Sequence, residues 1–337
     1  MRSYHLRTPG GLDGLTVSEH PVPRPGPTEL LVRVRAAALN RRDTLILDDR
    51  YPLPSRPGVI PLSDGAGEVV AVGERVTRFR AGDRVVGSYW PRWTAGRLHQ
   101  GLYDQLGNTV DGLLTEYAVL DQEWAVAVPE SLSWVEAATL PCAAVTAWTS
   151  LTGGRGLRPG ATVLTLGSGG VSLFALQLAK AMGCRVVVTT TDPAKAGRLT
   201  ALGADLVVDT AAGPEWSERV REFTAGEGVD LVVETVGPVT FEQSMRAVGL
   251  YGEVVFVGGG AAEPELRIRV ATYARTMATI RRVFVGSRED LTDLVRAVDA
   301  FGVRPVIDSV FPFDRAREAY GHFRAGRTFG KVVVEID

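Results

Sequence analysis

The chain has 337 residues, of which 45% are hydrophobic and 23% are charged, and its formal net charge at pH 7 is −2. This composition is ordinary for a globular protein, and a charge so close to zero implies no polyanion such as nucleic acid as an electrostatic partner. The 2 cysteines are too few for a disulfide framework. The length predicts two domains.

Nothing in the sequence predicts an association with membranes. It contains no run of about 18 apolar residues, so we expect no transmembrane helix. The first residues, Met1-Arg-Ser-Tyr-His, lack the apolar core of a signal peptide. We therefore expect a cytoplasmic protein that acts on a small molecule, with neither nucleic acid nor membrane as a partner.

The first part of the chain, residues 1–128, predicts a β-rich domain. Apolar runs at residues 30–37, 65–73 and 84–87 have the character of short strands. The segments between them are dense in glycine and proline, which is typical of the turns of a compact β domain. Residues 90–112 are polar and aromatic, and we expect them to form a loop.

Helical patterns begin after Pro129. Ser133 and Glu136 have the spacing of a capping box, which predicts the first turn of a helix. Pro141 predicts the end of that helix, because proline breaks the hydrogen-bond ladder. A second helical pattern covers about residues 146–151. The change from strands to helices predicts a domain boundary after residue 128.

The most informative segment follows at residues 162–183. An apolar run ends in Gly167-Ser168-Gly169-Gly170-Val171, which we term the glycine loop, and a helical pattern starts without a gap. Gly167 permits a tight turn, the next two glycines leave no side chain between backbone and ligand, and the helix start presents free N–H groups to an anion. Ser172 replaces the usual third glycine and is small enough to keep helix and sheet close. This order is typical of dinucleotide binding.

Strands and helices then alternate regularly up to Gly286. Counted from the strand before the glycine loop, the apolar runs predict about six parallel strands, the number that a complete doubly wound sheet needs. They lie at residues 162–166, 184–191, 206–208, 231–234, 251–257 and 280–285. We therefore expect a Rossmann domain at residues 129–286.

The C-terminal segment predicts two helices, at about residues 289–301 and 316–324, and a final strand at residues 330–336. Because the parallel sheet is already complete by Gly286, we expect this strand to return to the first domain. The predicted fold is therefore α/β, with a doubly wound parallel sheet and a β-rich domain built from residues 1–128 and 287–337.

Motifs along most of the chain carry a family resemblance. They are Ala38-Leu-Asn-Arg-Arg-Asp43, Pro61-Leu-Ser-Asp-Gly-Ala-Gly-Glu-Val69, Gly82-Asp-Arg-Val85, Asp111-Gly-Leu-Leu-Thr-Glu-Tyr117, residues 137–148, the glycine loop, residues 229–237 and Phe329-Gly-Lys-Val-Val333. With these motifs the chain resembles the zinc-independent, quinone-oxidoreductase-like branch of the medium-chain dehydrogenase/reductase (MDR) superfamily. The resemblance implies a GroES-like catalytic domain, a Rossmann domain with the active site in the cleft between them, and a homodimer joined through the strand at 280–285.

Zinc-dependent members of this family carry metal ligands at positions where this chain has other residues. Asn40 lies in the region of the first cysteine ligand, Ser63 stands at the histidine position, and only Cys142 falls where a third ligand is expected. A catalytic zinc needs three protein ligands, so we expect no metal. Residues 86–116 contain no cysteine for a structural zinc. We interpret Cys142 as a small buried hydrophobic residue.

The end of the second Rossmann strand discriminates between NAD and NADP. An acidic residue there binds the ribose of NAD, whereas this chain has Thr190 and Thr191. Asp192 comes later, before a proline, and is interpreted as a helix cap. Lys195 matches a lysine that contacts the 2′-phosphate in family members, which favours NADP(H). The alternative is that Lys195 and Arg198 belong to a solvated helix face.

The resemblance also implies further cofactor contacts. The nicotinamide is expected near Val236, Val257, Gly258 and Val285, which hold the family's strand-end positions, and Thr146 is a further expected contact. Hydride transfer itself needs mainly orientation and exclusion of water.

Without a metal, a substrate carbonyl must be polarised by hydrogen-bond donors. The candidates are Asn40, Tyr51 and Ser63, with Asp43 and Asp64 as residues that orient them. Asn40 and Tyr51 match positions that line the substrate cleft in quinone-oxidoreductase relatives. The alternatives are that Asn40 and Asp64 only satisfy local backbone groups and that Tyr51 lies on the surface.

An α,β-unsaturated carbonyl suits such a site, because hydride addition at its β-carbon gives an enolate that needs only modest stabilisation. We therefore expect zinc-independent, NADPH-dependent reduction of a quinone or of an activated C=C bond. One alternative is a zinc-free aldehyde or ketone reductase or alcohol dehydrogenase. The other is a protein that binds NADPH without catalysis.

Overall fold

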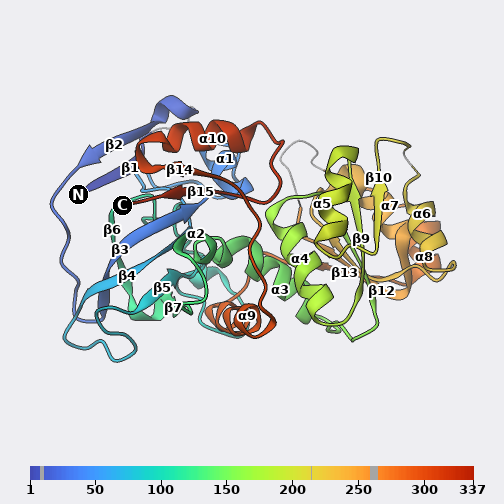
Figure 1. Ribbon diagram of the computed structural model, residues 1–337, viewed down its shortest axis with the longest axis horizontal. Coiled ribbons are helices and arrows are strands. Elements are labelled where there is room, and N and C mark those ends of the chain that lie inside the picture. Colours follow the sequence, from blue (N-terminus) through green and yellow to red (C-terminus); the bar gives the residue numbers. More distant parts are fainter. Residues whose placement is uncertain (8–10, 214, 259–264) are drawn as a thin grey trace. The chain divides into compact units, whose positions relative to one another are not determined.

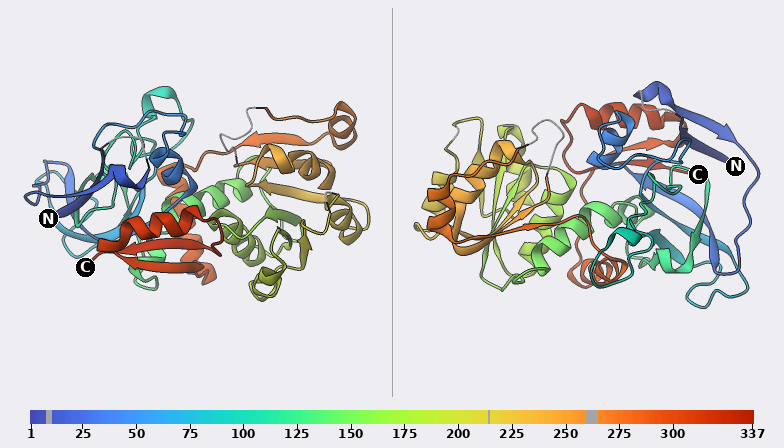
Figure 2. Two further views of the ribbon diagram at one scale, coloured as in Figure 1. Left: turned by 90° about the horizontal axis from the view of Figure 1, so that it is seen from above. Right: turned by 180° about the vertical axis from the view of Figure 1, so that it is seen from behind.

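The structure is a computed structural model that describes residues 1–7, 11–213, 215–258 and 265–337. They form two compact units, one made of Met1–Val145 and Val285–Asp337 and the other of Thr146–Phe284 (Figure 1). Both ends of the chain belong to the first unit, and they lie near each other in all views (Figure 2). Among the described residues, no helix combines the length and apolar character that crossing a membrane requires.

The first unit contains a seven-stranded sheet in the order β14-β15-β3-β4-β5-β7, with β6 added beside β3. The strands are β3 (Glu29–Ala38), β4 (Asp64–Val72), β5 (Arg84–Gly87), β6 (Tyr117–Asp121), β7 (Ala125–Ala127), β14 (Ile307–Pro312) and β15 (Lys331–Glu335). A hairpin of β1 (Arg2–Leu6) and β2 (Leu15–Glu19) lies outside it. Because β15 pairs antiparallel with β3, the expected return of the last strand to the first domain is confirmed.

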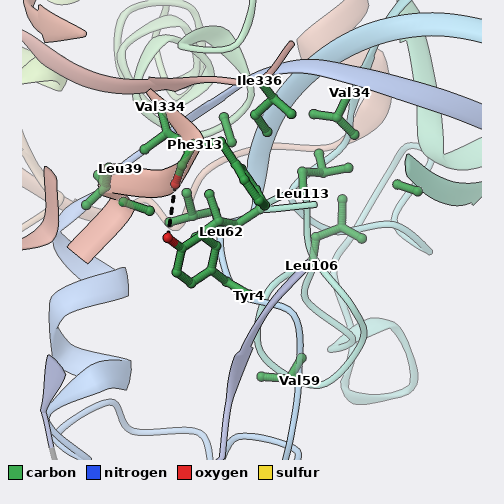
Figure 3. Close-up of a cluster of buried hydrophobic side chains, with 14 of the residues drawn as sticks. Tyr4, Val34, Leu39, Val59, Leu62, Leu106, Leu113, Phe313, Val334 and Ile336 are labelled. Atoms are coloured by element: carbon green, nitrogen blue, oxygen red, sulfur yellow. Dashed lines mark hydrogen bonds between the residues drawn. The ribbon is translucent and has the colours of Figure 1, made fainter. Parts of the chain in front are cut away.

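One hydrophobic core joins the two ends of the chain in this unit (Figure 3). The ring of Tyr4 packs edge-on against Phe313 at 5.1 Å, and the Tyr4 hydroxyl donates a hydrogen bond to the Phe313 carbonyl at 3.0 Å. Leu39 and Leu62 belong to the same cluster and are fully buried. Each directly precedes a candidate site residue, so core packing fixes the chain next to Asn40 and Ser63.

The helices of the first unit are α1 (Arg41–Leu47), α2 (Trp134–Ala137), α9 (Arg288–Phe301) and α10 (Ala316–Arg324). Ser133 and Glu136 form the expected capping box of α2. The expected end of this helix near Pro141 agrees with the structure, because α2 ends at Ala137. After a turn, a π-helix, Leu140–Ala144, begins and leads into α3 (Val145–Thr152). Pro141 lies in the first turn of that π-helix, where its missing N–H is not needed.

The boundary between the units follows Val145, whereas we expected it after residue 128. The physical reason is packing: α2 contacts β3 and β4, and the π-helix contacts β4 and β5, so both belong to the first unit. Residues 90–112 form turns and a short 3-10 helix, Gln100–Leu102. Trp90, at the start of this segment, is fully buried.

The second unit is built on a six-stranded parallel sheet in the order β10-β9-β8-β11-β12-β13. Its strands are β8 (Thr162–Leu166), β9 (Arg185–Thr190), β10 (Leu206–Asp209), β11 (Val229–Glu234), β12 (Val248–Phe256) and β13 (Thr279–Arg282). Its helices are α3, α4 (Gly170–Ala181), α5 (Ala196–Ala201), α6 (Ser217–Phe223), α7 (Pro238–Ala247) and α8 (Val270–Thr276). In chain order this arrangement is 3-2-1-4-5-6, which confirms the doubly wound Rossmann sheet.

Candidate active site

The glycine loop connects β8 to α4. Gly167 has a φ of 77°, which favours glycine, and Gly169 is the N-cap residue of α4 without a side-chain cap. A Cβ atom placed on Gly167 or Gly169 would meet no described heavy atom within 4 Å. Ser168 and Val171 complete the loop. The backbone of the glycine loop is therefore open to a ligand at the start of α4, at the carboxyl end of β8, where an anion site is expected.

Ser172 stabilises this arrangement in place of the third glycine. Its hydroxyl donates a hydrogen bond to the Leu166 carbonyl at 2.5 Å. The Thr235 hydroxyl donates to the same carbonyl at 2.8 Å, and the two hydroxyl oxygens are 3.3 Å apart. These contacts hold α4, the end of β8 and the turn after β11 together.

The end of β9 lies beside a short 3-10 helix, Pro193–Lys195. The Asp192 carboxylate accepts a hydrogen bond from the Ala194 N–H at 3.1 Å, so the interpretation of Asp192 as a helix cap is confirmed. Thr190 is buried and its hydroxyl bonds the backbone of Asp192, whereas Thr191 is exposed. Lys195 is half-buried and follows this cap directly.

The turns after β11 and β12 are organised by Glu234, a residue that we did not predict. Its carboxylate is fully buried and accepts hydrogen bonds from the Val236 and Gly237 N–H groups at 2.9 Å each. The Glu234 carbonyl accepts from the N–H groups of Val257 and Gly258, also at 2.9 Å. Val236, Val257 and Gly258 therefore come together at the carboxyl end of the sheet. The sequence feature that could have identified Glu234 is an acidic residue in an otherwise apolar strand.

Gly258 also approaches the turn after β11 closely, since a Cβ atom there would lie 2.5 Å from the carbonyl of Thr235. Thr146 is buried in α3 of the second unit. Val285 differs from expectation, because β13 ends at Arg282 and Val285 belongs to the first unit. Its φ of 63° is rare for a β-branched residue and carries backbone strain.

Asn40 is held between α1 and β15. It is 7% exposed and precedes α1 as the N-cap residue, where its N–H donates to the Asp43 carboxylate at 2.7 Å. On its other side, the Lys331 ammonium donates to the Asn40 side-chain oxygen at 2.6 Å and to the Leu39 carbonyl at 2.8 Å. We did not predict Lys331 as a site residue. The sequence feature that could have identified it is a charged residue at the start of the apolar run Lys331-Val-Val-Val.

Ser63 and Asp64 lie beside this arrangement, and both are fully buried. The Ser63 hydroxyl donates to one Asp64 oxygen at 2.9 Å. The other Asp64 oxygen accepts from the Cys142 N–H at 3.3 Å and lies 3.6 Å from the Lys331 ammonium. The Ser63 proton is thus engaged by Asp64, which makes Asn40 the stronger candidate donor to a substrate. The residue before them, Leu62, has a left-handed φ of 67°, a strain that is frequent at functional sites.

Both carboxylates have raised pKa values. Burial raises the pKa of Asp43 to about 6, and the opposing effects are the charge of Arg42 and the Asn40 N–H. Burial also raises the pKa of Asp64, and the Lys331 ammonium is the largest opposing effect. Carboxylates with raised pKa values are common where chemistry takes place, although buried ion pairs share this property.

Tyr51 belongs to a neighbouring polar cluster. Its hydroxyl lies 2.9 Å from the Tyr89 hydroxyl and donates to the Gln105 side-chain oxygen at 3.0 Å. The buried Arg42 guanidinium lies over the Tyr51 ring at 5.4 Å and over the Tyr89 ring at 4.6 Å. Burial raises the pKa of Tyr51, and the charge of Arg42 opposes the rise. Tyr51 is therefore a half-buried member of a network and not a surface residue.

Cys142 lies where the two clusters meet. Burial raises the pKa of its thiol, the Asp64 carboxylate raises it further, and Lys331 and Arg42 oppose the rise. The residue as a whole keeps some exposure, whereas we interpreted it as a small buried hydrophobic residue. Within the described ranges, no group of three His, Cys, Asp or Glu side chains is arranged to hold a metal ion.

Comparisons with known proteins agree with this architecture. Residues 26–130 match the family profile described as alcohol dehydrogenase GroES-like domain, and residues 170–300 match the one described as zinc-binding dehydrogenase. A zinc-type alcohol dehydrogenase-like protein of Schizosaccharomyces pombe is 40% identical over 97% of this chain and 96% of its own length.

Two further relatives extend the comparison. The acryloyl-coenzyme A reductase of Metallosphaera sedula is 32% identical over 96% of this chain and 97% of its own length. A crystal structure from Sinorhizobium meliloti 1021, provisionally named an alcohol dehydrogenase, has a TM-score of 0.93 at 40% identity and covers 99% of this chain and 98% of its own. Fold, glycine loop and relatives agree: the chain belongs to the MDR superfamily and is an NAD(P)-dependent oxidoreductase.

Proposed function

We propose that this protein is a zinc-independent, NADPH-dependent reductase that transfers hydride to the C=C bond of a quinone or another α,β-unsaturated carbonyl compound. The observation that carries the proposal is the side-chain nitrogen of Asn40. It is buried and makes no hydrogen bond of good geometry with the described residues, although it is close enough to the Asp64 carboxylate to lower its pKa. An amide nitrogen has two hydrogens, so at least one is left for a substrate oxygen.

Zinc is the first point to test, because the matched profile and the Schizosaccharomyces relative carry it in their names. The residues at the family's ligand positions are Asn40, Ser63 and Cys142. A catalytic zinc needs three protein ligands, with any cysteine as thiolate, whereas the Cys142 thiol has a raised pKa. The Lys331 ammonium, bonded to Asn40 and 3.6 Å from Asp64, adds a positive charge that opposes a metal ion. These residues do not fit a catalytic zinc.

The cofactor, when bound, supplies the hydride that adds to the β-carbon of the substrate. The Asn40 amide would donate to the carbonyl oxygen, on which negative charge grows as the C=C electrons move to form the enolate. Tyr51 is the second candidate donor, since burial raises its pKa and keeps the phenol protonated, although its proton would have to leave the Gln105 side-chain oxygen to reach a substrate. The α-carbon then takes a proton from solvent, which gives the saturated carbonyl compound.

Product analysis tests the proposal. Metal-free protein, prepared with a chelator, is incubated with NADPH and an α,β-unsaturated aldehyde, which offers a C=C and a C=O bond to the same hydride. We expect the saturated aldehyde, at a rate that added zinc does not raise. Formation of the allylic alcohol would contradict C=C reduction, and an activity that returns only with zinc would contradict zinc independence.

A second candidate function is the reduction of an aldehyde or ketone, or the reverse oxidation of an alcohol. The alcohol-dehydrogenase names of two relatives favour it, as does the buried pair of Ser63 and Asp64, in which a hydroxyl already donates to a carboxylate at 2.9 Å. If the allylic alcohol is the product, Ser63→Ala and Asp64→Asn become the variants that decide the mechanism.

The preference for NADPH rests on Lys195. The strand β9 ends in threonines, without the acidic residue that binds the ribose of NAD, and Asp192 caps the following 3-10 helix through the Ala194 N–H. We expect Lys195→Ala to raise KM for NADPH about 10- to 100-fold, the size of one lost charge-assisted hydrogen bond, and to leave KM for NADH nearly unchanged. Steady-state kinetics with both cofactors measure the two KM values. Arg198→Ala is the matched control, for which we expect a smaller rise in KM for NADPH. Equal effects on both cofactors would contradict the preference.

We also propose that the protein is a homodimer joined through β13. In the part of the chain that the structure describes, β13 is the last strand of its sheet and pairs with β12 on one side. Large apolar side chains of β13 and of the segment just before it are exposed, including Ile280 (41%), Met277 (48%) and Tyr273 (48%). An unpaired strand edge with exposed apolar side chains is typical of association surfaces. Sedimentation equilibrium at micromolar concentration is expected to give a dimer, and Ile280→Glu a monomer. Val17→Glu, an equally exposed position in the first unit, is the control, and a monomeric unmodified protein would contradict the proposal.

A further inference from the structure

Lys331 is an unusual residue for the place that it occupies. It is the first residue of β15, its side chain is 3% exposed, and its ammonium has three neighbours. It donates to the Leu39 carbonyl at 2.8 Å and to the Asn40 side-chain oxygen at 2.6 Å, and it lies 3.6 Å from the Asp64 carboxylate. An ammonium in such a dry place is retained only with well-placed acceptors.

The contact with Asn40 determines which way the amide faces. An asparagine side chain can be turned over, which exchanges its oxygen and nitrogen at almost the same positions. An ammonium donates hydrogen bonds and accepts none. The amide atom that faces Lys331 at 2.6 Å must therefore be the oxygen, because the opposite orientation would bring NH2 against NH3⁺ and lose a charge-assisted hydrogen bond.

We propose that Lys331 is a positioning residue: its ammonium holds the Asn40 amide with the NH2 group directed at the substrate oxygen. The inference rests on the proposed role of Asn40 as the donor to the carbonyl. The ammonium also withdraws electron density from the amide oxygen, which makes the opposite NH2 group a stronger donor. In this arrangement Asn40 lies between the Lys331 ammonium and the substrate oxygen. The positive charge therefore acts on the substrate through the neutral amide.

A purely structural role for Lys331 gives different expectations. Its bond to the Leu39 carbonyl joins β15 to the end of β3, and its charge compensates Asp64. If that were its whole role, Lys331→Met would lower stability without a specific effect on the chemical step. A positioning role predicts that kcat falls while KM for the substrate and the dissociation constant for NADPH stay close to those of the unmodified protein.

A double-mutant cycle of Lys331→Met and Asn40→Ala tests the inference. We expect Lys331→Met to lower kcat about 10- to 100-fold, as for loss of one charge-assisted hydrogen bond, and Lys331→Arg to restore part of it. Because Lys331 acts through Asn40, the double variant should be no slower than Asn40→Ala alone. Independent effects that multiply in the double variant would overturn the inference.

A charge-neutral background and an NMR measurement complement the cycle. If Lys331→Met does not fold because Asp64 is left without its counter-charge, the cycle is run in the Asp64→Asn background, which removes both charges. The side-chain NH2 resonance of Asn40, identified by its loss in Asn40→Asp, gives a readout without turnover and should shift in Lys331→Met. If the unmodified protein reduces C=O and not C=C bonds, the proposed function fails, but the same cycle on the aldehyde still decides the role of Lys331.

Discussion

Replacing Asn40 by alanine is expected to lower kcat for enone reduction about 100- to 1000-fold, which is the usual cost of removing one preorganised oxyanion donor. The amide interacts most strongly with the oxygen when it carries the enolate charge, so kcat should fall more than KM rises. Stopped-flow or steady-state measurements of NADPH oxidation with a saturating enone give both parameters.

Two further variants separate this role from the structural role of Asn40 as the N-cap of α1. Asn40→Asp has nearly the same shape, preserves a cap and still accepts a hydrogen bond from Lys331, but it offers the substrate an acceptor instead of a donor. It should therefore be stable and inactive. Arg41→Ala changes the exposed neighbour and should keep normal kinetics. An Asn40→Asp variant with normal activity would show that the amide is not the donor.

Replacing Gly169 by valine is expected to weaken NADPH binding at least about 100-fold without destabilising the fold. Gly169 has φ −77° and ψ 171°, a conformation that any residue adopts, and a Cβ atom there meets no described heavy atom within 4 Å. The added side chain would project into the open space at the start of α4, where the pyrophosphate is expected. Titration of NADPH by fluorescence and a thermal unfolding curve measure the two effects.

The comparison with Gly167 and Gly321 makes this prediction specific. Gly167→Val should lower both affinity and stability, because its φ of 77° is strained for a side chain. Gly321→Ala, in the interior of α10 with no described atom within 4 Å of its Cβ position, should bind NADPH normally and be as stable or slightly more stable. Unchanged NADPH binding in Gly169→Val would mean that the cofactor does not approach this end of α4.

Some predictions were confirmed because their determinants are local. The glycine loop, the cap at Asp192 and the alternation of strands and helices each depend on the spacing of residues within one or two turns. The order of strands in the parallel sheet then follows from short right-handed connections. The return of the last strand was confirmed for a similar reason, since a complete parallel sheet leaves no place for it.

The same local reasoning was wrong where distant packing decides. The first unit was expected to end at residue 128, but α2 and the π-helix pack on β3, β4 and β5 and so belong to that unit. Strand β13 was expected to extend to Val285. Its neighbour β12 ends at Phe256, which pairs with Arg282, so no paired residue remains for Val285.

The sequence by itself determined the fold class, with its glycine loop between a strand and a helix, because glycine spacing and apolar periodicity are local properties. Only the tertiary structure decided which polar residues of the candidate site act together. Lys331 meets Asn40 from almost the other end of the chain, and the hydrogen bond between them exists because β15 pairs with β3. Such a contact depends on sheet pairing between distant segments, and no spacing within either segment encodes it.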